Sequence, residues 1–221
     1  MSKTFDNEWE KIHSEREWGQ YPTEYVVRFI ARNFYKMERD KVKILDFCCG
    51  AGAHTWFLAR EGFDTYAFDG SHSAVERVQK RFEKEKLKAD LLVCDALELP
   101  YEKASFDGVV DNVSVTGNRM EYIPVMYKEI YDLLKNGGKL ITAVFGKKTS
   151  GYGTGIEEEK DTFSHMENSI FPRSGVVHFW DNDTIKNMLQ EIGFVDVHVE
   201  NERHTDNGKT CDIIVAIATK A

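Results

Sequence analysis

A glycine-containing loop that begins with an acidic residue stands early in the chain, in the run Asp46-Phe47-Cys48-Cys49-Gly50-Ala51-Gly52. Gly50 and Gly52 allow a sharp turn and let a ligand approach the backbone, because a Cβ would block both. In an open parallel sheet, ligands bind beyond the carboxyl ends of the strands. Many G-x-G loops are simple turns, so this run indicates a ligand site only together with other polar groups.

Two further carboxylates follow apolar, β-rich segments and could supply those groups. Asp69 closes the segment that starts at Phe63, and Asp95 closes the segment over residues 89–94. A carboxylate about twenty residues after the glycines can accept two hydrogen bonds from a ribose diol. A carboxylate at the next strand end can accept one from an exocyclic amine such as that of adenine. Either Asp alone would usually be a helix cap or a turn residue, but three such strand ends in succession favour a ligand site.

Strand-like and helix-like segments alternate along the chain, and this pattern predicts how those residues are positioned. Strands are expected over residues 42–47, 63–68, 89–94, 106–111 and 139–145, each connected to the next by a helix or a longer crossing segment. Such connections indicate a parallel sheet with helices on both faces. Residues 194–200 and 212–219 are the last two strands, joined by a polar hairpin-like segment, so the final strand runs antiparallel. We predict an α/β, Rossmann-like three-layer sandwich with a seven-stranded, mostly parallel sheet and an antiparallel last strand.

The composition narrows the classes of protein to be considered. The 221 residues fit a single domain. The 29 basic and 37 acidic residues give a net charge of -8, which argues against a general nucleic-acid binder, because phosphate contacts need clustered Lys and Arg. The cysteines lack zinc-site spacing, so we predict no metal; Cys94 and Cys211 adjoin apolar runs and are expected to be core thiols. Without a signal-like or membrane-spanning segment, the protein is expected to be cytoplasmic with no membrane partner.

Over residues 40–221 the chain resembles the class I S-adenosylmethionine-dependent methyltransferases. The family pattern of an acid followed by alternating glycines matches Asp46, Gly50 and Gly52, with Cys48 in place of the first glycine. Other similar segments are Phe106-Asp107-Gly108-Val109-Val110, Leu133-Leu134-Lys135-Asn136-Gly137-Gly138-Lys139-Leu140 and Gly193-Phe194. The resemblance implies methyl transfer with S-adenosyl-L-methionine as cofactor.

The resemblance also implies roles for residues at the strand ends. Asp46 and the backbone from Gly50 to Gly52 would hold the methionine end of the cofactor. Asp69 would hold the ribose, while Asp95 and the Ala96 amide would hold the adenine. The complete predicted cofactor-binding set is Asp46, Cys48, Gly50, Ala51, Gly52, Asp69, Gly70, Asp95, Ala96, Asn112 and Tyr21.

The N-terminal segment is a candidate lid. In similar enzymes an N-terminal helical piece folds over the cofactor, and residues 1–37 would be that piece here. Trp18 could contact the acceptor and Tyr21 the cofactor from this lid. The alternative is a helix that Trp packs on the sheet.

Residues 146–180 are predicted to be a substrate-side insertion, and the polar, glycine-containing part up to residue 171 is expected to be a mobile loop. By resemblance, His178 would face the acceptor; a surface position is the alternative. Arg119 could bind an anionic acceptor or belong to a solvated turn. No catalytic residue is named, because methyl transfer from an activated sulfonium depends mainly on positioning and on exclusion of water.

A small-molecule acceptor is favoured over a nucleic acid, because Asp111-Asn112-Val113-Ser114 stands where DNA and RNA methyltransferases have an Asn-Pro-Pro-Tyr type of motif. The protein is expected to be a monomer or a homodimer. Two other functions were weighed. A nicotinamide-dependent dehydrogenase would have a third glycine near Thr55. A non-catalytic regulator or subunit that binds S-adenosylmethionine would keep the same loop, since a fold does not determine a function.

Overall fold

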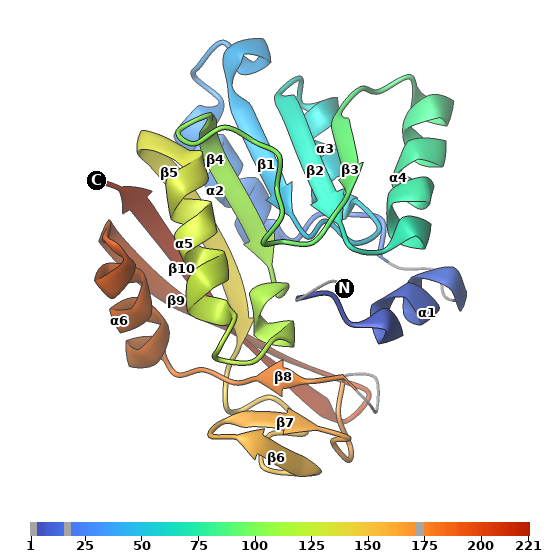
Figure 1. Ribbon diagram of the computed structural model, residues 1–221, viewed down its shortest axis with the longest axis vertical. Coiled ribbons are helices and arrows are strands. Elements are labelled where there is room, and N and C mark those ends of the chain that lie inside the picture. The colour runs from blue at the N-terminus through green and yellow to red at the C-terminus, as the bar shows by residue number, and fades with distance from the viewer. Residues whose placement is uncertain (1–3, 16–18, 171–174) are drawn as a thin grey trace.

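The computed structural model describes residues 4–15, 19–170 and 175–221, and its centre is a seven-stranded sheet in the order β3-β2-β1-β4-β5-β10-β9 (Figure 1). Its strands are β1 (Lys43–Phe47), β2 (Asp64–Asp69), β3 (Asp90–Val93), β4 (Phe106–Asn112), β5 (Leu134–Phe145), β9 (Phe194–Asp206) and β10 (Lys209–Lys220). The first five strands pair in parallel, whereas β10 pairs antiparallel with both β5 and β9. β10 therefore runs against the rest of this sheet, which confirms the predicted strand pattern.

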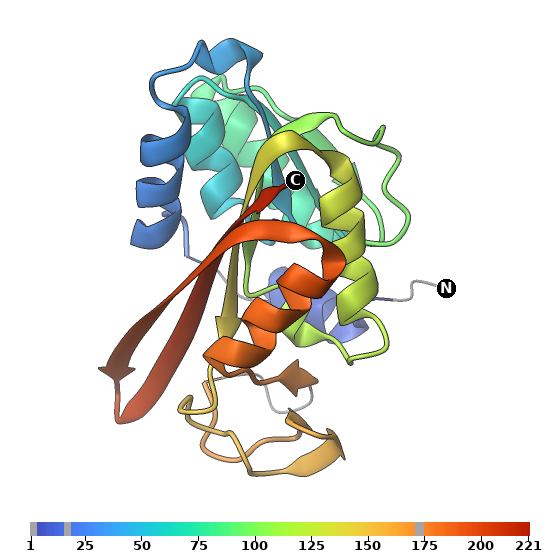
Figure 2. The same ribbon diagram turned by 90° about the vertical axis from the view of Figure 1, so that its left-hand side faces the viewer.

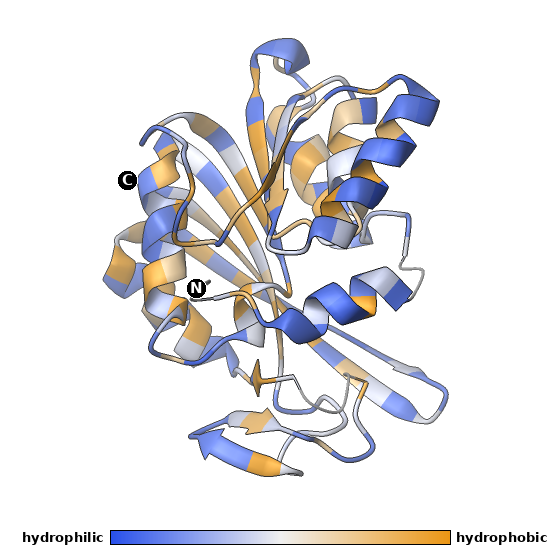
Figure 3. Cartoon of the chain, turned by 45° about the vertical axis from the view of Figure 1, so that its right-hand side comes forward, coloured by the Kyte–Doolittle hydropathy of each residue, from blue (hydrophilic) through white to orange (hydrophobic). Residues whose placement is uncertain are grey.

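Helices cover both faces of the sheet. α2 (Glu24–Phe34) and α3 (Ala53–Arg60) share one core with Ile44 of β1 and Val110 of β4. α5 (Ile123–Leu133) and α6 (Asn182–Ile192) share the other core with Leu45 and Val109. Successive strand side chains point to opposite faces, so neighbouring residues of one strand serve different layers. The hydropathy colouring shows the resulting pattern, with apolar strands inside and hydrophilic outer faces on the helices (Figure 3). The predicted three-layer sandwich is confirmed.

Local sequence signals set the helix boundaries, with one exception. α4 (His72–Glu85) begins after Ser71, whose hydroxyl accepts a hydrogen bond from the Ala74 amide at 3.1 Å. α6 begins at a capping box formed by Asp181 and Thr184. The exception is α2, which starts at Glu24 with Thr23 as its N-cap but without a capping hydrogen bond from the Thr23 side chain.

The last two strands are longer than expected and form a hairpin that projects from the body of the protein (Figure 2). We expected a polar connection between residues 201 and 209. Instead, β9 and β10 stay paired up to the turn, where Lys209 is the partner of Asp206. Asn207 and Gly208 have φ values of 48° and 76°, which suits a two-residue turn whose twist matches that of the strands. The polar residues of this segment therefore reflect exposure of a two-stranded ribbon and not a loop.

A second, three-stranded sheet occupies part of the predicted insertion and consists of β6 (Ile156–Glu159), β7 (Thr162–Ser164) and β8 (Val177–His178). It lies beyond the carboxyl end of β5, at the lower end of Figure 1. The expectation of an irregular mobile loop was wrong for these strands. The apolar side chains of this segment are spaced irregularly along the sequence and so show no strand or helix period, but they lie close together in the folded chain. They form a small separate core of Phe163, Met166, Val177 and Phe179.

The N-terminal helix α1 (Asn7–Glu15) lies near the carboxyl ends of β1 to β3 and docks on the start of α4 (Figure 1). The Glu10 carboxylate accepts hydrogen bonds from the hydroxyls of Ser71 and Ser73, both at 2.6 Å. Two short 3-10 helices complete the described elements, η1 (Arg39–Lys41) and η2 (Val115–Gly117). In the described part of the chain, every helix is too short or too polar to cross a bilayer.

Candidate functional site

A cavity of about 340 Å³ lies at the carboxyl ends of β1 to β4, where the sequence predicts a ligand site. Its volume falls within the range of small-molecule pockets, about 300–1,000 Å³. Among the predicted cofactor residues, those that line it are Asp46, Cys48, Gly50, Ala51, Asp69, Gly70, Ala96, Asn112 and Tyr21. The lining residues do not include Gly52, which caps α3 and packs against Val78, or Asp95, whose carboxylate accepts hydrogen bonds from Thr4.

The glycine loop has left-handed backbone conformations at alternating positions. Cys48, Gly50 and Gly52 have φ values of 52°, 52° and 75°. A left-handed residue with a side chain is disfavoured by roughly 1–2 kcal/mol, so Cys48 holds a conformation that glycine would adopt more easily. Cys48 stands where the family motif has its first glycine. Its backbone adopts the left-handed conformation of that glycine, and its side chain lines the cavity.

Asp46, at the end of β1, is buried beneath this loop with 1% of its surface exposed. The Thr55 hydroxyl of α3 donates a hydrogen bond to its Oδ2 at 2.5 Å. Burial raises the pKa of the Asp46 carboxyl to about 7, and the hydrogen bonds from Thr55 offset only part of that rise. Asp46 thus changes its charge near neutral pH at the floor of the cavity.

Asp69 and Asp95 occupy the ends of β2 and β3 as expected. Asp69 accepts hydrogen bonds from the Gly50 and Ser71 amides, at 2.8 and 2.9 Å, and burial raises its pKa. Asp95 accepts hydrogen bonds from the Thr4 amide and hydroxyl at 2.8 and 2.9 Å. The N-terminal segment therefore contacts the strand end at which the sequence resemblance places adenine.

The N-terminal segment also lines the cavity with aromatic side chains that sequence reasoning did not single out. A Cβ built on Gly70 would lie 2.2 Å from a ring carbon of Phe5, so Phe5 packs directly on that glycine. On α1, Trp9 and His13 are four residues apart and share one face of the helix. Trp9 lies beside Gly117 of η2, and His13 lies beside Gly50. Helical spacing was the available signal, but nothing in the sequence shows which element that face contacts.

Comparisons with known proteins agree with this geometry. A family model described as a methyltransferase domain matches residues 44–138, which include the glycine loop and the ends of β1 to β4. The demethylmenaquinone methyltransferase of Lactococcus lactis is 27% identical over 177 residues, covering 74% of this chain and 69% of that protein. The matched region is a methyltransferase domain, and the comparisons together support a class I S-adenosylmethionine-dependent methyltransferase. The protein is an enzyme, and its cofactor is S-adenosyl-L-methionine.

Solved structures of other methyltransferases share the fold. A methyltransferase from Methanosarcina mazei, described as S-adenosylmethionine-dependent, superposes with a TM-score of 0.71 at 21% identity, covering 90% of this chain and 98% of that one. Phosphoethanolamine N-methyltransferase 2 of Haemonchus contortus, in complex with S-adenosyl-L-methionine, gives a TM-score of 0.67 at 19% identity. That superposition covers 96% of this chain and 56% of the other. At these identities the superpositions establish the fold.

The three residues predicted to contact the acceptor of this methyltransferase are Trp18, Arg119 and His178. Trp18 falls outside the described residues. Arg119 forms an ion pair with Glu158 of β6 at 3.0 Å, and the described cavity lining does not include it. His178 of β8 is buried, also outside that lining, and its Nδ1 lies 2.7 Å from the Thr162 hydroxyl. Burial lowers the pKa of His178 to about 4, so its imidazole is neutral at physiological pH. Contact of Arg119 or His178 with the acceptor stays a prediction.

The remaining expectations concern Tyr21 and Cys94. Tyr21 lies at the cavity rim with 75% of its surface exposed, and its ring packs edge-on against Trp56 at 5.9 Å. Cys94, expected to be a core thiol, packs against the main core but is only half-buried, and it also lines the cavity because it stands one residue beyond the end of β3.

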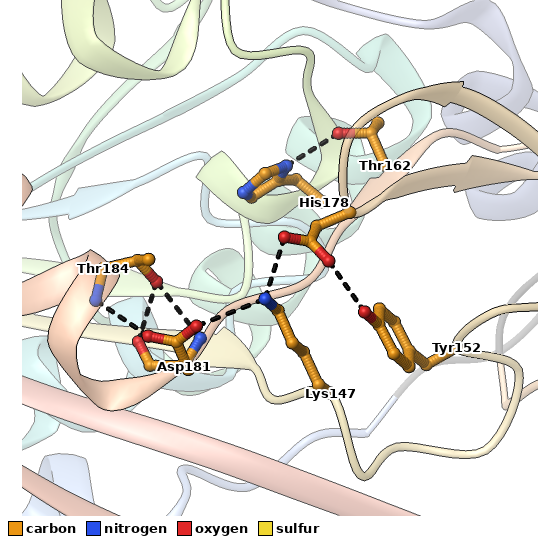
Figure 4. A network of polar contacts seen from close by, with 7 residues as sticks. Lys147, Tyr152, Thr162, His178, Asp181 and Thr184 are labelled. Carbon is orange, nitrogen blue, oxygen red and sulfur yellow. Dashed lines mark hydrogen bonds and ion pairs between the residues drawn. The ribbon is translucent and has the colours of Figure 1, made fainter.

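A charged network joins the small sheet to the main body of the methyltransferase (Figure 4). The Lys147 ammonium contacts Asp161 Oδ2 at 2.8 Å and Asp181 Oδ2 at 3.2 Å. The Tyr152 hydroxyl donates to Asp161 Oδ1 at 2.7 Å. Although burial opposes it, hydrogen bonds from Lys147 and Tyr152 hold the pKa of Asp161 below its usual value. Lys147 thus links the segment after β5 to the N-cap of α6.

Replacement of Asp161 by Asn is expected to lower the free energy of unfolding by about 1 kcal/mol, because Lys147 and Tyr152 lose a charged acceptor in a half-buried network. Chemical denaturation with urea measures the change. Asp183→Asn, at an exposed position of α6, is the control and is expected to shift stability by less than about 0.5 kcal/mol. Equal midpoints for both variants would contradict a stabilising role for this network.

Proposed function

We propose that this methyltransferase transfers a methyl group to a small-molecule acceptor that enters the cavity between α1, η2 and the glycine loop. The observation that carries the proposal is the pair of buried carboxylates in the cavity wall. Asp46 and Asp69 are 1% and 7% exposed, and within the described residues neither forms an ion pair with Lys or Arg. Buried carboxylates without a Lys or Arg partner favour a cationic ligand, and S-adenosylmethionine carries a sulfonium and an ammonium group.

The residues present fit that cofactor. Asp46 and the amides of the glycine loop would hold its methionine end, Asp69 its ribose hydroxyls, and Asp95 with the Ala96 amide its adenine. The cofactor supplies an electrophilic methyl group on a positively charged leaving group. The chain itself would contribute orientation and exclusion of water, because Phe5, Trp9 and Met126 line the cavity. The names of the relatives, which include demethylmenaquinone methyltransferases, support a small-molecule acceptor.

Turnover tests the proposal directly. The purified protein is incubated with S-adenosylmethionine labelled in its methyl group and with a panel of small-molecule acceptors, and labelled products are detected together with S-adenosylhomocysteine. Cofactor-dependent labelling of an acceptor is expected. Binding of the cofactor without transfer to any member of a broad panel would favour a non-catalytic regulator or subunit. Absence of binding at millimolar cofactor would contradict the whole assignment.

Asp69→Ala is expected to weaken binding of S-adenosylmethionine by about 5- to 150-fold, since the ribose loses an acceptor worth ~1–3 kcal/mol. Isothermal titration calorimetry measures the affinity. Asp90→Ala, on the exposed edge strand β3, is the matched control and should leave the affinity unchanged. An Asp69→Ala protein that is folded and binds as tightly as the wild type would refute the ribose assignment.

The compartment is part of the same proposal. The four cysteines are present as free thiols. Free thiols at three cavity positions, Cys48, Cys49 and Cys94, fit an enzyme that works in a reducing compartment such as the cytoplasm.

A further inference from the structure

A chain of four polar side chains runs along the cavity beside the glycine loop. It starts at His54 of α3, whose Nε2 lies 3.3 Å from the Thr23 amide and 3.2 Å from the Thr23 hydroxyl. Tyr25 of α2 follows two positions later, and its hydroxyl interacts with the Thr23 side chain. Tyr25 donates to Asn112 Oδ1, at the end of β4, at 2.5 Å. Three separate elements are thus joined next to the predicted ligand.

The direction of these hydrogen bonds sets the orientation of the Asn112 amide. The Tyr25 hydroxyl has a single hydrogen, and it donates that hydrogen to Asn112 Oδ1. The oxygen end of the amide is therefore turned towards α2. Asn112 lines the cavity, whereas Tyr25 is 8% exposed and lies behind it. Among the described residues, no acceptor is bound to Asn112 Nδ2, which leaves that end of the amide for the cavity.

The position of Asn112 indicates which part of a ligand it meets. In the parallel pairing of β1 with β4, Phe47 is the partner of Asp111, so Asn112 lies beside Cys48 at the start of the glycine loop. An amide nitrogen is a donor only, and it therefore selects an oxygen acceptor. In the proposed function, the methionine end of the cofactor lies at this loop. Its carboxylate needs a hydrogen-bond donor, which the ionised carboxylates of Asp46 and Asp69 cannot supply.

We propose that Tyr25 is a positioning residue, which holds the Asn112 amide with Nδ2 turned into the cavity so that it donates to the carboxylate of the cofactor. This inference rests on the proposed function. Tyr25 remains a donor over the working pH range, because burial raises the pKa of its phenol to about 12. The contact is made by a residue on α2 with no access to the cavity, so it acts only through Asn112.

Calorimetric titration of the full chain with S-adenosylhomocysteine, and with its decarboxylated analogue, tests the proposal. Tyr25→Phe keeps the packing of α2 but frees the amide, and it is expected to weaken S-adenosylhomocysteine binding about five- to tenfold. The decarboxylated analogue should bind Tyr25→Phe and the wild type equally. Asn112→Asp keeps the oxygen that Tyr25 binds but faces the carboxylate with another acceptor, so its loss should be larger than that of Tyr25→Phe.

A double-mutant cycle separates positioning from general stability. If Tyr25 acts through Asn112, Tyr25→Phe should have no further effect on affinity in an Asn112→Ala background. Tyr35→Phe, at the C-terminal end of the same helix and away from the cavity, should leave affinity unchanged. Additive losses in the cycle, or equal losses for the decarboxylated analogue, would overturn the inference while leaving the proposed function intact. A wild-type protein that binds neither probe would overturn both.

Discussion

Replacement of Asp46 by Asn is expected to stabilise the unliganded protein at pH 8 and, in the same variant, to weaken its binding of S-adenosylmethionine. The Asp46 carboxyl is 1% exposed, and burial raises its pKa from 3.8 to about 7. A shift of this size corresponds to roughly 4 kcal/mol between the two protonation states. Asn retains the shape of the side chain and an acceptor for the Thr55 hydroxyl, but carries no charge to bury.

The direction of the pH dependence follows from the raised pKa. Between about pH 4 and 7 the folded protein keeps the proton on Asp46, whereas the unfolded chain has released it. The stability that this proton provides is therefore complete below about pH 4, falls as the pH rises from 4 towards 7, and is absent above 7. The Asp46→Asn variant has no carboxyl to ionise at this position, so it does not lose stability as the pH rises. Its unfolding free energy should exceed that of the wild type by several kcal/mol at pH 8 and by close to zero at pH 4.

Binding of the cofactor should show the opposite dependence in the wild type. A cationic ligand favours ionised Asp46, so binding releases a proton and the affinity rises with pH up to about 7, by roughly tenfold per pH unit on the acidic side. Calorimetry in buffers of different ionisation enthalpy measures that proton release. The variant should bind more weakly at pH 8 and lose the pH dependence.

The control for both measurements is Asp206→Asn, at the exposed end of the β9–β10 hairpin, which should change neither stability nor affinity. An Asp46→Asn variant that is less stable than the wild type at pH 8 would contradict the charge-burial account. Wild-type affinity that is independent of pH between 5.5 and 8 would contradict a role for ionised Asp46 in binding.

The sequence predicts the parallel strands, the reversed last strand and the ligand end of the sheet because those features depend on local patterns. Apolar runs that end in Asp69 or Asp95, with helices between them, leave few topologies for a right-handed parallel sheet. The carboxyl ends of such strands must then meet at one edge. Spacing alone therefore places the glycine loop, Asp69 and Asp95 at this edge, and the family resemblance adds the other predicted residues. Most of the predicted set lines the observed cavity.

The contributions of the N-terminal segment and of α2 could not be predicted in the same way. Tyr25 and Phe29 lie on the same apolar face of α2, and both are buried. Only the three-dimensional register shows that the Tyr25 hydroxyl reaches Asn112, 87 positions further along the chain. The small sheet was missed for a related reason, since Phe163 and Phe179 are brought together by pairing of β7 with β8 and not by a local period.

Both the backbone conformation and the packing at position 52 require glycine. Replacement of Gly52 by Ala is expected to lower the free energy of unfolding by about 2–4 kcal/mol. It caps α3 with φ and ψ of 75° and 31°, a conformation that disfavours any side chain. A Cβ there would also lie 2.5 Å from Cγ2 of Val78, a β-branched residue that is buried in α4 and has little freedom to move.

Gly62→Ala separates these two causes. Gly62 has a φ of 87°, but a Cβ added at this position would have no atom within 4 Å, so its replacement should cost only the backbone term of about 1–2 kcal/mol. Val78→Ala removes the colliding methyl groups, and in combination with Gly52→Ala it should be less destabilising than the sum of the single changes, by about 0.5–3 kcal/mol. Denaturant titrations of the four variants measure these terms. Additive losses for the Gly52 and Val78 changes, together with equal losses at Gly52 and Gly62, would show that the left-handed backbone, and not contact between the glycine loop and α4, makes glycine necessary at position 52.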